Sequence, residues 1–282
     1  MAQILVLGGN GKVGRRLIGA LREDGHQGVA ASRSSALRFD WRDPSTWKAA
    51  IGSADGVFVV GPGSAHDWSG LLSAFLHRAG EAGVRHAVLL SARGVEFLPG
   101  GAVDLAERAL TASPVPWTVL RPSHFAQNFT EAMFAPVDGV ITAPVGDAAE
   151  PFVDVQDVAE VAARILARGT HVSERIALSG PAALTFRQAA GVLAAASGTA
   201  VRFRSEDPSA HAARLTEAGT PPGYVEWRMA MLEGIRTGAD AYLSQGVEEV
   251  LGRPATAFAD WAAREVPHSA FATAAAAQDR PH

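Results

Sequence analysis

The stretch Ile4-Leu5-Val6-Leu7-Gly8-Gly9-Asn10-Gly11-Lys12-Val13-Gly14 decides how this chain folds. Its first four residues are all apolar, which is typical of a strand buried on both faces of a sheet. After the glycines, Val13, Leu17 and Leu21 recur at the spacing of one helix face. The stretch therefore predicts a strand, a glycine-rich turn and a helix.

The glycines of this turn fit both Gly8-x-x-Gly11-x-x-Gly14 and Gly9-x-Gly11-x-x-Gly14. In such turns one glycine permits the tight bend, one lets the backbone approach a pyrophosphate, and one lets the helix pack closely on the strand. The phosphates bind the free N–H groups of the helix N-terminus. A glycine motif alone is weak evidence, but here it has the strand and helix that it requires. We therefore predict a dinucleotide site rather than a purely structural turn, with the loop residues Gly8, Asn10, Gly11, Lys12, Val13 and Gly14.

The second predicted strand, Gly28 to Ala31, ends at Ser32-Arg33 and indicates which dinucleotide binds. NAD-selective sites place an acid about 20 residues after the glycine loop, where it binds the ribose 2′-hydroxyl. Here Arg33 offers a cation instead, and a guanidinium can grip a 2′-phosphate and stack on adenine. NADP(H) is favoured over NAD(H), with a solvated loop arginine as the alternative. Asp40 and Trp41 are weaker candidates for contacts with the adenine, because Trp41 could equally belong to the core.

Composition narrows the class of protein. The 282 residues are 48% hydrophobic with a formal net charge of -4, enough for one large domain or a domain with a lobe. No basic run suggests nucleic-acid binding, and the absence of cysteine excludes disulfides and thiolate metal sites. No signal peptide or membrane-spanning stretch is evident. We expect a cytoplasmic protein, monomer or homodimer, whose partner is a small-molecule substrate and neither nucleic acid nor a membrane.

Strands and helices alternate through the first two-thirds of the chain, which predicts an α/β fold with a doubly wound parallel (Rossmann) sheet. In such sheets, ligands bind at the carboxyl ends of the strands. The residues that fall there, in addition to the glycine loop, are Gly61, Pro62, Ser91, Pro122 and His124. Beyond the second strand, the predicted strands are Gly56 to Val60, His86 to Leu90, Trp117 to Leu120 and Arg175 to Leu178, and the predicted helices are Pro44 to Ile51, Asp67 to Ala82 and Val103 to Ala112.

The later chain predicts a smaller lobe on the substrate side. Asp157-Val158-Ala159-Glu160 resembles a capping box, and Thr185-Phe186-Arg187-Gln188 is another that opens a helix through Ala196. A short strand is expected near Val201 to Arg204. We assign residues 1–180 to the dinucleotide-binding domain and 181–267 to a mainly helical lobe, with contributions from about 123–150. The Ala-rich tail, 268–282, is expected to be flexible.

The chain lacks the Tyr-x-x-x-Lys pair with which short-chain dehydrogenases move the proton that accompanies hydride. Arg228 stands four residues after Tyr224, and Gly246 four after Tyr242. Candidates for this role are Ser91 and His124, whose imidazole suits proton transfer near neutral pH. For each, a purely structural hydrogen bond is the alternative. No His-x-x-x-His pair or carboxylate cluster is present, so no metal site is predicted.

Several stretches along nearly the whole chain match a known family. With them the chain resembles the NmrA-like atypical short-chain dehydrogenases, and more closely the ergot-alkaloid branch, the festuclavine and agroclavine dehydrogenases. The matching stretches are Leu7-Gly8-Gly9-Asn10-Gly11-Lys12-Val13-Gly14-Arg15-Arg16, Phe39-Asp40-Trp41 through Ser45-Thr46-Trp47, Val88-Leu89-Leu90-Ser91, Trp117-Thr118-Val119-Leu120-Arg121-Pro122, Phe125 with Asn128-Phe129, Pro151-Phe152-Val153 with Asp157-Val158-Ala159, and Gly252-Arg253-Pro254.

The resemblance implies an NADP-type cofactor on the loop Gly8, Gly11 and Gly14, with Arg33 near its 2′-phosphate. It also implies that hydride transfer can proceed without the Tyr/Lys pair, because known substrates include iminium ions, which accept hydride without prior protonation. His124 replaces an aromatic residue of the family, which points away from an ergot-type substrate. We expect an NADPH-dependent reductase of a compact electron-poor molecule, an iminium, quinone, enone or carbonyl compound, in secondary metabolism. The alternatives are a non-catalytic NADP-sensing regulator of the NmrA type and, less favoured, an isomerase or cyclase.

Overall fold

The computed structural model describes residues 1–63 and 65–266; the tail expected to be flexible lies outside them. Its centre is a seven-stranded sheet in the order β3-β2-β1-β4-β5-β6-β9, parallel throughout. The strand order reverses between β1 and β4, which confirms the predicted doubly wound fold. The strands are β1 (Gln3–Leu7), β2 (Gln27–Ser32), β3 (Leu37–Arg38), β4 (Gly56–Val59), β5 (His86–Leu90), β6 (Trp117–Pro122) and β9 (Glu174–Leu178).

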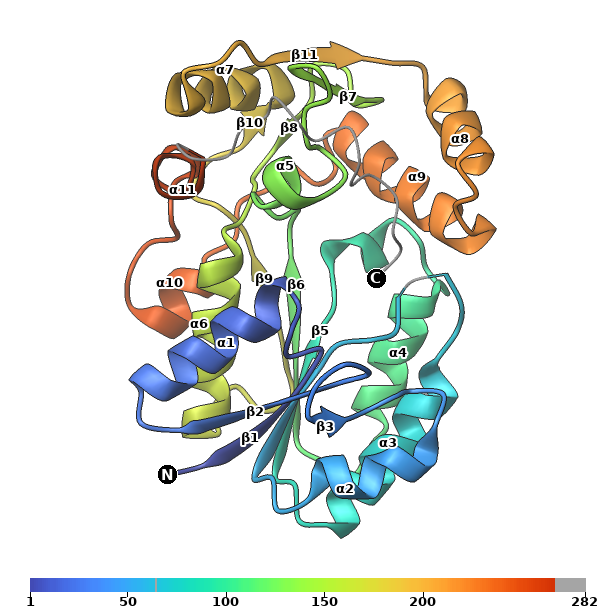
Figure 1. The fold of residues 1–282 in the computed structure, drawn as a ribbon, viewed down its shortest axis with the longest axis vertical. Coiled ribbons are helices and arrows are strands. Elements are labelled where there is room, and N and C mark those ends of the chain that lie inside the picture. Colours follow the sequence, from blue (N-terminus) through green and yellow to red (C-terminus); the bar gives the residue numbers. More distant parts are fainter. Residues whose placement is uncertain (64, 267–282) are drawn as a thin grey trace.

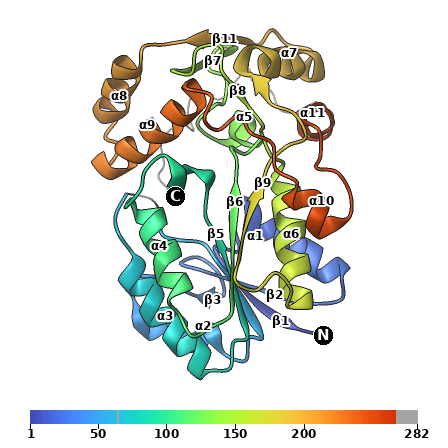
Figure 2. The ribbon, with the colours of Figure 1, turned by 180° about the vertical axis from the view of Figure 1, so that it is seen from behind.

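Helices cover both faces of this sheet, as Figures 1 and 2 show. Alternate residues of β1 separate the two layers, since successive side chains of a strand point to opposite faces. Ile4 and Val6 pack with α1 and α6, whereas Leu5 and Leu7 join the core that includes α3 and α4. The helices around the sheet are α1 (Lys12–Glu23), α2 (Trp47–Ile51) after the 3-10 turn η1 (Pro44–Thr46), α3 (Ser69–Glu81), α4 (Ala102–Thr111) after η2 (Arg93–Glu96), and α6 (Val155–Arg168).

A lobe with its own aromatic core lies beyond the carboxyl end of β6 (Figure 1). Two small strand pairs frame it: β8 with β10, antiparallel, and β7 with β11, parallel. Phe129, Phe134, Phe152 and Phe186 pack ring against ring at its centre. Its elements are α5 (Asn128–Glu131), β7 (Val140–Ala143), β8 (Ala149–Glu150), β10 (Leu184–Thr185), α7 (Phe186–Ser197), β11 (Arg202–Ser205), α8 (Pro208–Glu217), α9 (Pro222–Arg236) and α11 (Phe258–Glu265).

Two expectations differ from the structure. Helix α6 begins at Val155 and Asp154 caps it, so the acid of the expected capping box, Asp157, lies inside the first turn. Asp157 is fully buried there, and the hydrogen bonds that it accepts from Arg253 and Thr256 offset the cost of that burial. Helix α10 (Gly246–Leu251), which falls in the range expected for the lobe, packs on α6 and β9 of the sheet domain instead. The capping box of α7 is present as predicted.

None of the helices in the described part of the chain combines the length and apolar character needed to cross a membrane.

Candidate functional site

The glycine loop between β1 and α1 has the shape that a dinucleotide needs. Gly8 has a φ of 68°, in the left-handed region that glycine favours, and its carbonyl accepts a hydrogen bond from Gly11 N–H over 2.8 Å. A Cβ at Gly9 would lie 2.5 Å from the Ala30 Cβ, and one at Gly14 would lie 2.4 Å from the Gly8 oxygen. A Cβ at Gly11 would meet only the Gly8 oxygen, at 3.1 Å. Gly9 and Gly14 therefore serve close packing, while Gly11 leaves room for a ligand.

The N-terminus of α1 is available to an anion. No side chain among the described residues caps it, and its first turn contains no acid. Val13 is buried in the core, so only its backbone N–H can serve a phosphate. Lys12 is partly buried, and burial lowers the pKa of its ammonium despite the attraction of Glu131. These features together fit the phosphates of a dinucleotide.

The loop after β2 leaves Arg33 unpaired. Its side chain is exposed and makes no hydrogen bond or ion pair within residues 1–63 and 65–266. Beside it, the Asn10 amide donates to the Ser32 hydroxyl at 3.2 Å and the Ser34 hydroxyl at 3.4 Å, which ties this loop to the glycine loop. A guanidinium free of partners can turn toward a 2′-phosphate.

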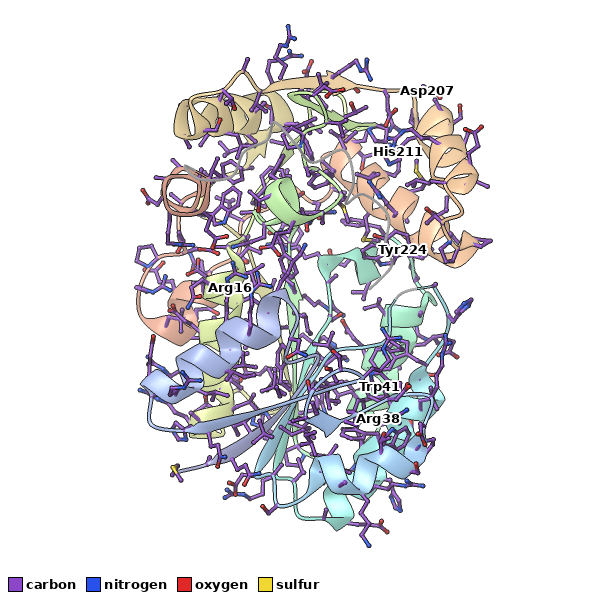
Figure 3. All side chains as sticks on the ribbon, in the orientation of Figure 1. Arg16, Arg38, Trp41, Asp207, His211 and Tyr224 are labelled. Atoms are coloured by element: carbon purple, nitrogen blue, oxygen red, sulfur yellow. The ribbon has the colours of Figure 1, made fainter. Side chains whose placement is uncertain are left out.

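Trp41 occupies the core, which supports the alternative to an adenine contact. Trp41, labelled in Figure 3, is 7% exposed. Its indole N–H donates to the Val60 carbonyl, and its ring packs against Trp47 and Trp68. Asp40 accepts the backbone N–H of Arg42 through its carboxylate, at the start of the turn that follows β3.

Two residues of the loop after β4 have different surroundings. Gly61 faces Trp68, to which an added Cβ would come within 2.4 Å, and Pro62 is exposed. Trp68 therefore requires a glycine at position 61, whatever else that glycine contacts.

Ser91, at the end of β5, is hydrogen bonded to a buried carboxylate. Its hydroxyl donates to Glu107 of α4 over 2.5 Å, and Glu107 also accepts two hydrogen bonds from Arg121, at 3.0 and 2.7 Å. Since a hydroxyl has one proton, Ser91 can offer a ligand only its lone pairs while this bond is intact. Pro122, one position beyond Arg121, is the buried last residue of β6.

His124, just past the end of β6, is held by two carboxylates from distant segments. Its Nδ1 lies 3.2 Å from the Glu150 carboxylate of β8 and 3.7 Å from the Asp240 carboxylate after α9. Its backbone N–H donates to Glu150 as well, at 2.9 Å. Its Nε2 makes no hydrogen bond with the described residues, and this atom is not fully buried.

The surroundings of His124 change the chemistry expected of it. Burial alone would lower the pKa of its imidazole, but the hydrogen bonds and negative charges of Asp240 and Glu150 prevail and raise that pKa to about 9. This raised pKa differs from the expected titration near neutral pH and favours the imidazolium form of His124 at pH 7. Burial in turn raises the pKa of Glu150 above its usual range.

The fold also creates a carboxylate cluster that the sequence does not show. His124, Glu150 and Asp240 could each offer one ligand atom to a cation, all within 4.8 Å of one another. The Arg93 guanidinium of η2 already supplies positive charge there, 3.4 Å from Asp240. We therefore interpret the cluster as a buried network of ion pairs.

Sequence reasoning missed Glu107, Glu150, Asp240 and Arg93. Glu107 had a local signal, because it stands three residues before Leu110 on the buried face of α4. The other three lie in β8, in η2 and after α9, where no periodicity distinguishes a buried charge from an exposed one.

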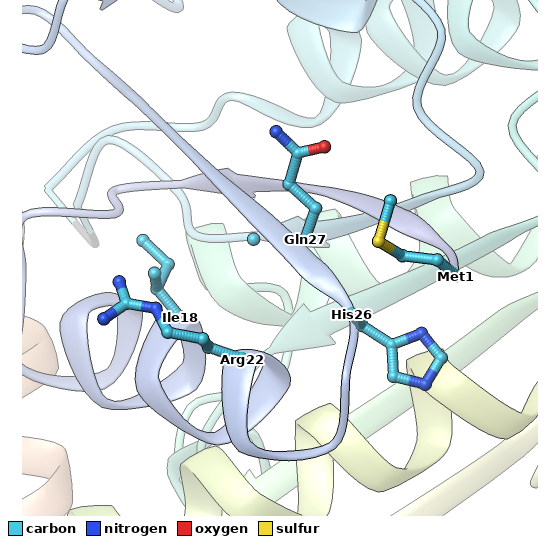
Figure 4. Close-up of a pocket in the computed structure, with 6 residues that line it drawn as sticks. Met1, Ile18, Arg22, His26 and Gln27 are labelled. Carbon is cyan, nitrogen blue, oxygen red and sulfur yellow. The ribbon is translucent and has the colours of Figure 1, made fainter.

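One surface hollow lies away from these residues. It measures about 330 Å³ and is lined by Met1, Ile18, Arg22, His26, Gln27 and Gly28, near the amino ends of β1 and β2 (Figure 4). A second, of about 260 Å³, lies between the segments 65–67 and 98–102 of the sheet domain and α9 of the lobe. The candidate site is therefore defined by the strand ends and not by the larger hollow.

Comparisons with known proteins agree with this geometry. A family described as NAD(P)H-binding matches residues 8–168. The chain is 34% identical over 281 residues to the (4-alkanoyl-5-oxo-2,5-dihydrofuran-3-yl)methyl phosphate reductase of Streptomyces griseus, covering 92% of this chain and 96% of that protein. It is 31% identical to the agroclavine dehydrogenase of Claviceps fusiformis, covering 92% and 95%.

Solved structures share the fold. An NADPH-dependent quinone oxidoreductase from Escherichia coli superposes with a TM-score of 0.76 at 23% identity, covering 93% of this chain and 98% of that one. NmrA, a negative transcriptional regulator solved with NAD, gives a TM-score of 0.74 at 15% identity.

Proposed function

The chain belongs to the NAD(P)H-binding family of oxidoreductases, and from that premise we propose that it is an NADPH-dependent reductase of a compact, electron-poor small molecule. Its resemblance to NmrA-like proteins and to the clavine dehydrogenases is confirmed by the same relatives. The acceptor classes proposed are the iminium, quinone, enone and carbonyl compounds.

The observation that carries the proposal is the position of His124. Its imidazolium lies beyond β6, on the edge of the sheet where the glycine loop follows β1 and Ser91 follows β5. When bound, NADPH supplies the hydride. For a quinone, enone or carbonyl acceptor, Nε2 of His124 then supplies or orients the proton that the reduced acceptor needs, the part that the missing Tyr-x-x-x-Lys pair plays in other dehydrogenases.

Ser91 has the lesser part in this proposal. Its proton is committed to Glu107, so we assign it the role of a hydrogen-bond acceptor that orients the cofactor or the substrate. The preference for NADPH rests on Arg33, which has no partner within the described residues, and on the absence of an acid at this position.

The experiment is a binding titration followed by an activity panel. NADPH and NADH are titrated by fluorescence, and NADPH oxidation is then followed with iminium, quinone, enone and simple carbonyl compounds. We expect tight NADPH binding and turnover with at least one class. Tight binding without any turnover would overturn the reductase proposal in favour of an NmrA-type sensor. The missing Tyr/Lys pair is compatible with such a sensor but not with an ordinary short-chain dehydrogenase.

A further inference from the structure

We propose that Glu150 and Asp240 are positioning residues that hold His124 as a fixed cation with Nε2 free for the substrate, and that this restricts the substrate to acceptors that develop negative charge on oxygen. Enones and quinones belong to that class, and iminium ions do not. The inference rests on the proposed function, because it names the substrate class of the same site.

The orientation of His124 is fixed from both its ring and its backbone. An ionised carboxylate only accepts hydrogen bonds, so Nδ1 donates to Glu150 in that form, and Glu150 also accepts the backbone N–H of His124. On the other side, the His124 carbonyl accepts the Val153 N–H over 2.9 Å. The ring lies 5.7 Å from that of Phe134, centroid to centroid. The imidazole is therefore fixed with Nδ1 toward the carboxylates, which leaves Nε2 as the free nitrogen.

With Glu150 and Asp240 both ionised, the charges of the cluster balance when His124 is protonated. Glu150 from β8 is 0% exposed and Asp240, after α9, is 1% exposed. Facing them are His124 and, from η2, Arg93, which is 1% exposed and lies 3.9 Å from the centre of the Tyr242 ring. Removing the His124 proton would leave one uncompensated negative charge in a buried cluster, which is costly.

The second carboxylate oxygen of Glu150 also bears on the charge of His124. Oε2 is buried without a hydrogen-bond partner in the described residues. An ionised carboxylate buried in this way favours a nearby positive charge, and the His124 Nδ1 lies 3.2 Å from its other oxygen. An ionised Glu150 therefore favours the imidazolium through its charge, in addition to the two hydrogen bonds that it accepts from Nδ1 and from the backbone N–H of His124.

A fixed imidazolium suits one class of acceptor. When hydride adds to the β-carbon of an enone, the electron pair moves to the carbonyl oxygen, which takes the Nε2 proton; the resulting enol becomes the saturated ketone. A quinone likewise takes one hydride and one proton to become a hydroquinone. In both, NADPH becomes NADP⁺ and water returns a proton to His124. An iminium ion needs no proton and starts as a cation, so the imidazolium repels it.

The first test uses the unmodified protein saturated with NADPH. We expect kcat/KM for a neutral enone or quinone to exceed that for a cyclic iminium ion of similar size by at least about ten-fold, the effect of one unfavourable charge contact. Faster reduction of the iminium ion would overturn the substrate class. Failure to reduce any acceptor would overturn the proposed function itself, and the substrate class with it.

The second test isolates the positioning residues. In Glu150→Gln and Asp240→Asn, the His124 ring is followed by NMR across pH, its signal assigned by its loss in His124→Gln. The control is Glu206→Gln, which alters another carboxylate–histidine contact, with His211 in the lobe. We expect the His124 titration, and the alkaline limb of kcat for the enone or quinone, to move to lower pH in the two variants and not in the control. The use of two variants guards against one that does not fold, and an unmoved titration in a folded one would overturn the positioning roles.

Discussion

Arg16 of α1 forms an ion pair with Glu265 of α11, although 249 residues separate them (Figure 3 labels Arg16). The Nη2 of Arg16 lies 3.0 and 3.1 Å from the two oxygens of Glu265. Arg16 also donates to the carbonyl of Lys12 in the first turn of α1, and Glu265 accepts from Gln127 before α5. The pair therefore joins the helix that follows the glycine loop to the lobe.

Arg16→Ala should lower the free energy of unfolding more than a substitution that removes an exposed ion pair. Its side chain is 15% exposed and that of Glu265 is 21% exposed, so solvent screens the pair only in part. We expect a loss of about 1 to 2 kcal/mol in the free energy of unfolding, measured by urea denaturation. The control is Arg236→Ala, whose partner Glu233 is 50% exposed, and there the loss should be clearly smaller because solvent screens the pair. Equal losses would contradict the structural role of the pair.

Arg33→Ala should remove most of the preference for NADPH. One charge-assisted phosphate contact is worth about 1.5 to 3 kcal/mol, so the Kd of NADPH should rise at least about ten-fold while that of NADH is unchanged. Fluorescence titration of both cofactors measures this. Arg22→Ala, at the far end of α1, removes the same charge without the proposed contact. Equal affinities for the two cofactors in the unmodified protein would refute the assignment of Arg33.

Gly11→Val should abolish dinucleotide binding and leave the fold largely intact. The added side chain would fill the open space beside the loop, since its Cβ meets only one atom within 4 Å. Binding is measured by titration and folding by circular dichroism. Gly19→Ala, in the helix α1 that follows Gly11, is the control, because nothing lies within 4 Å of its added Cβ. Normal binding by a folded Gly11→Val protein would place the dinucleotide elsewhere.

His124→Ala should lower kcat by about 100- to 10,000-fold for an acceptor that needs a proton. The rate of the unmodified enzyme should fall as the pH rises through about 9, and this limb should vanish in the variant. Ser91→Ala should cost less and keep the limb, because the Ser91 hydroxyl donates to Glu107 and not to the substrate. A limb that persists without His124 would assign the proton to another group.

Stability should also decline at alkaline pH because of His124. Its folded-state pKa is raised, so its contribution is complete below the unfolded value of about 6.5 and is lost as pH rises through about 9. The contribution is on the order of 3 kcal/mol. Urea denaturation across this window should show the decline in the unmodified protein and a flatter profile in His124→Gln. His77→Gln, an exposed histidine of α3, should retain the decline.

The sequence by itself determined the doubly wound sheet and the edge at which its candidate site residues lie. The apolar run of β1, the stripe of α1 and the glycines between them are local patterns, and they predicted the elements that the structure contains. Once the strands were predicted to be parallel, the placement of Ser91 and His124 near one edge followed from topology. Local capping was less certain, since Asp154 and Asp157 both precede an apolar stripe and only packing decides which of them caps α6.

Only the tertiary structure decided what surrounds the reactive side chains. Trp41 follows an apolar segment too short to show an alternating pattern, so the sequence could not predict its burial. The structure shows that burial through its contacts with Trp47 and Trp68. His124 meets Glu150 and Asp240 because β8 and the segment after α9 return to the end of β6. The charge of an imidazole depends on burial and on neighbouring carboxylates, and neither is encoded in adjacent residues. The sequence could therefore name His124, but only the fold raised its pKa.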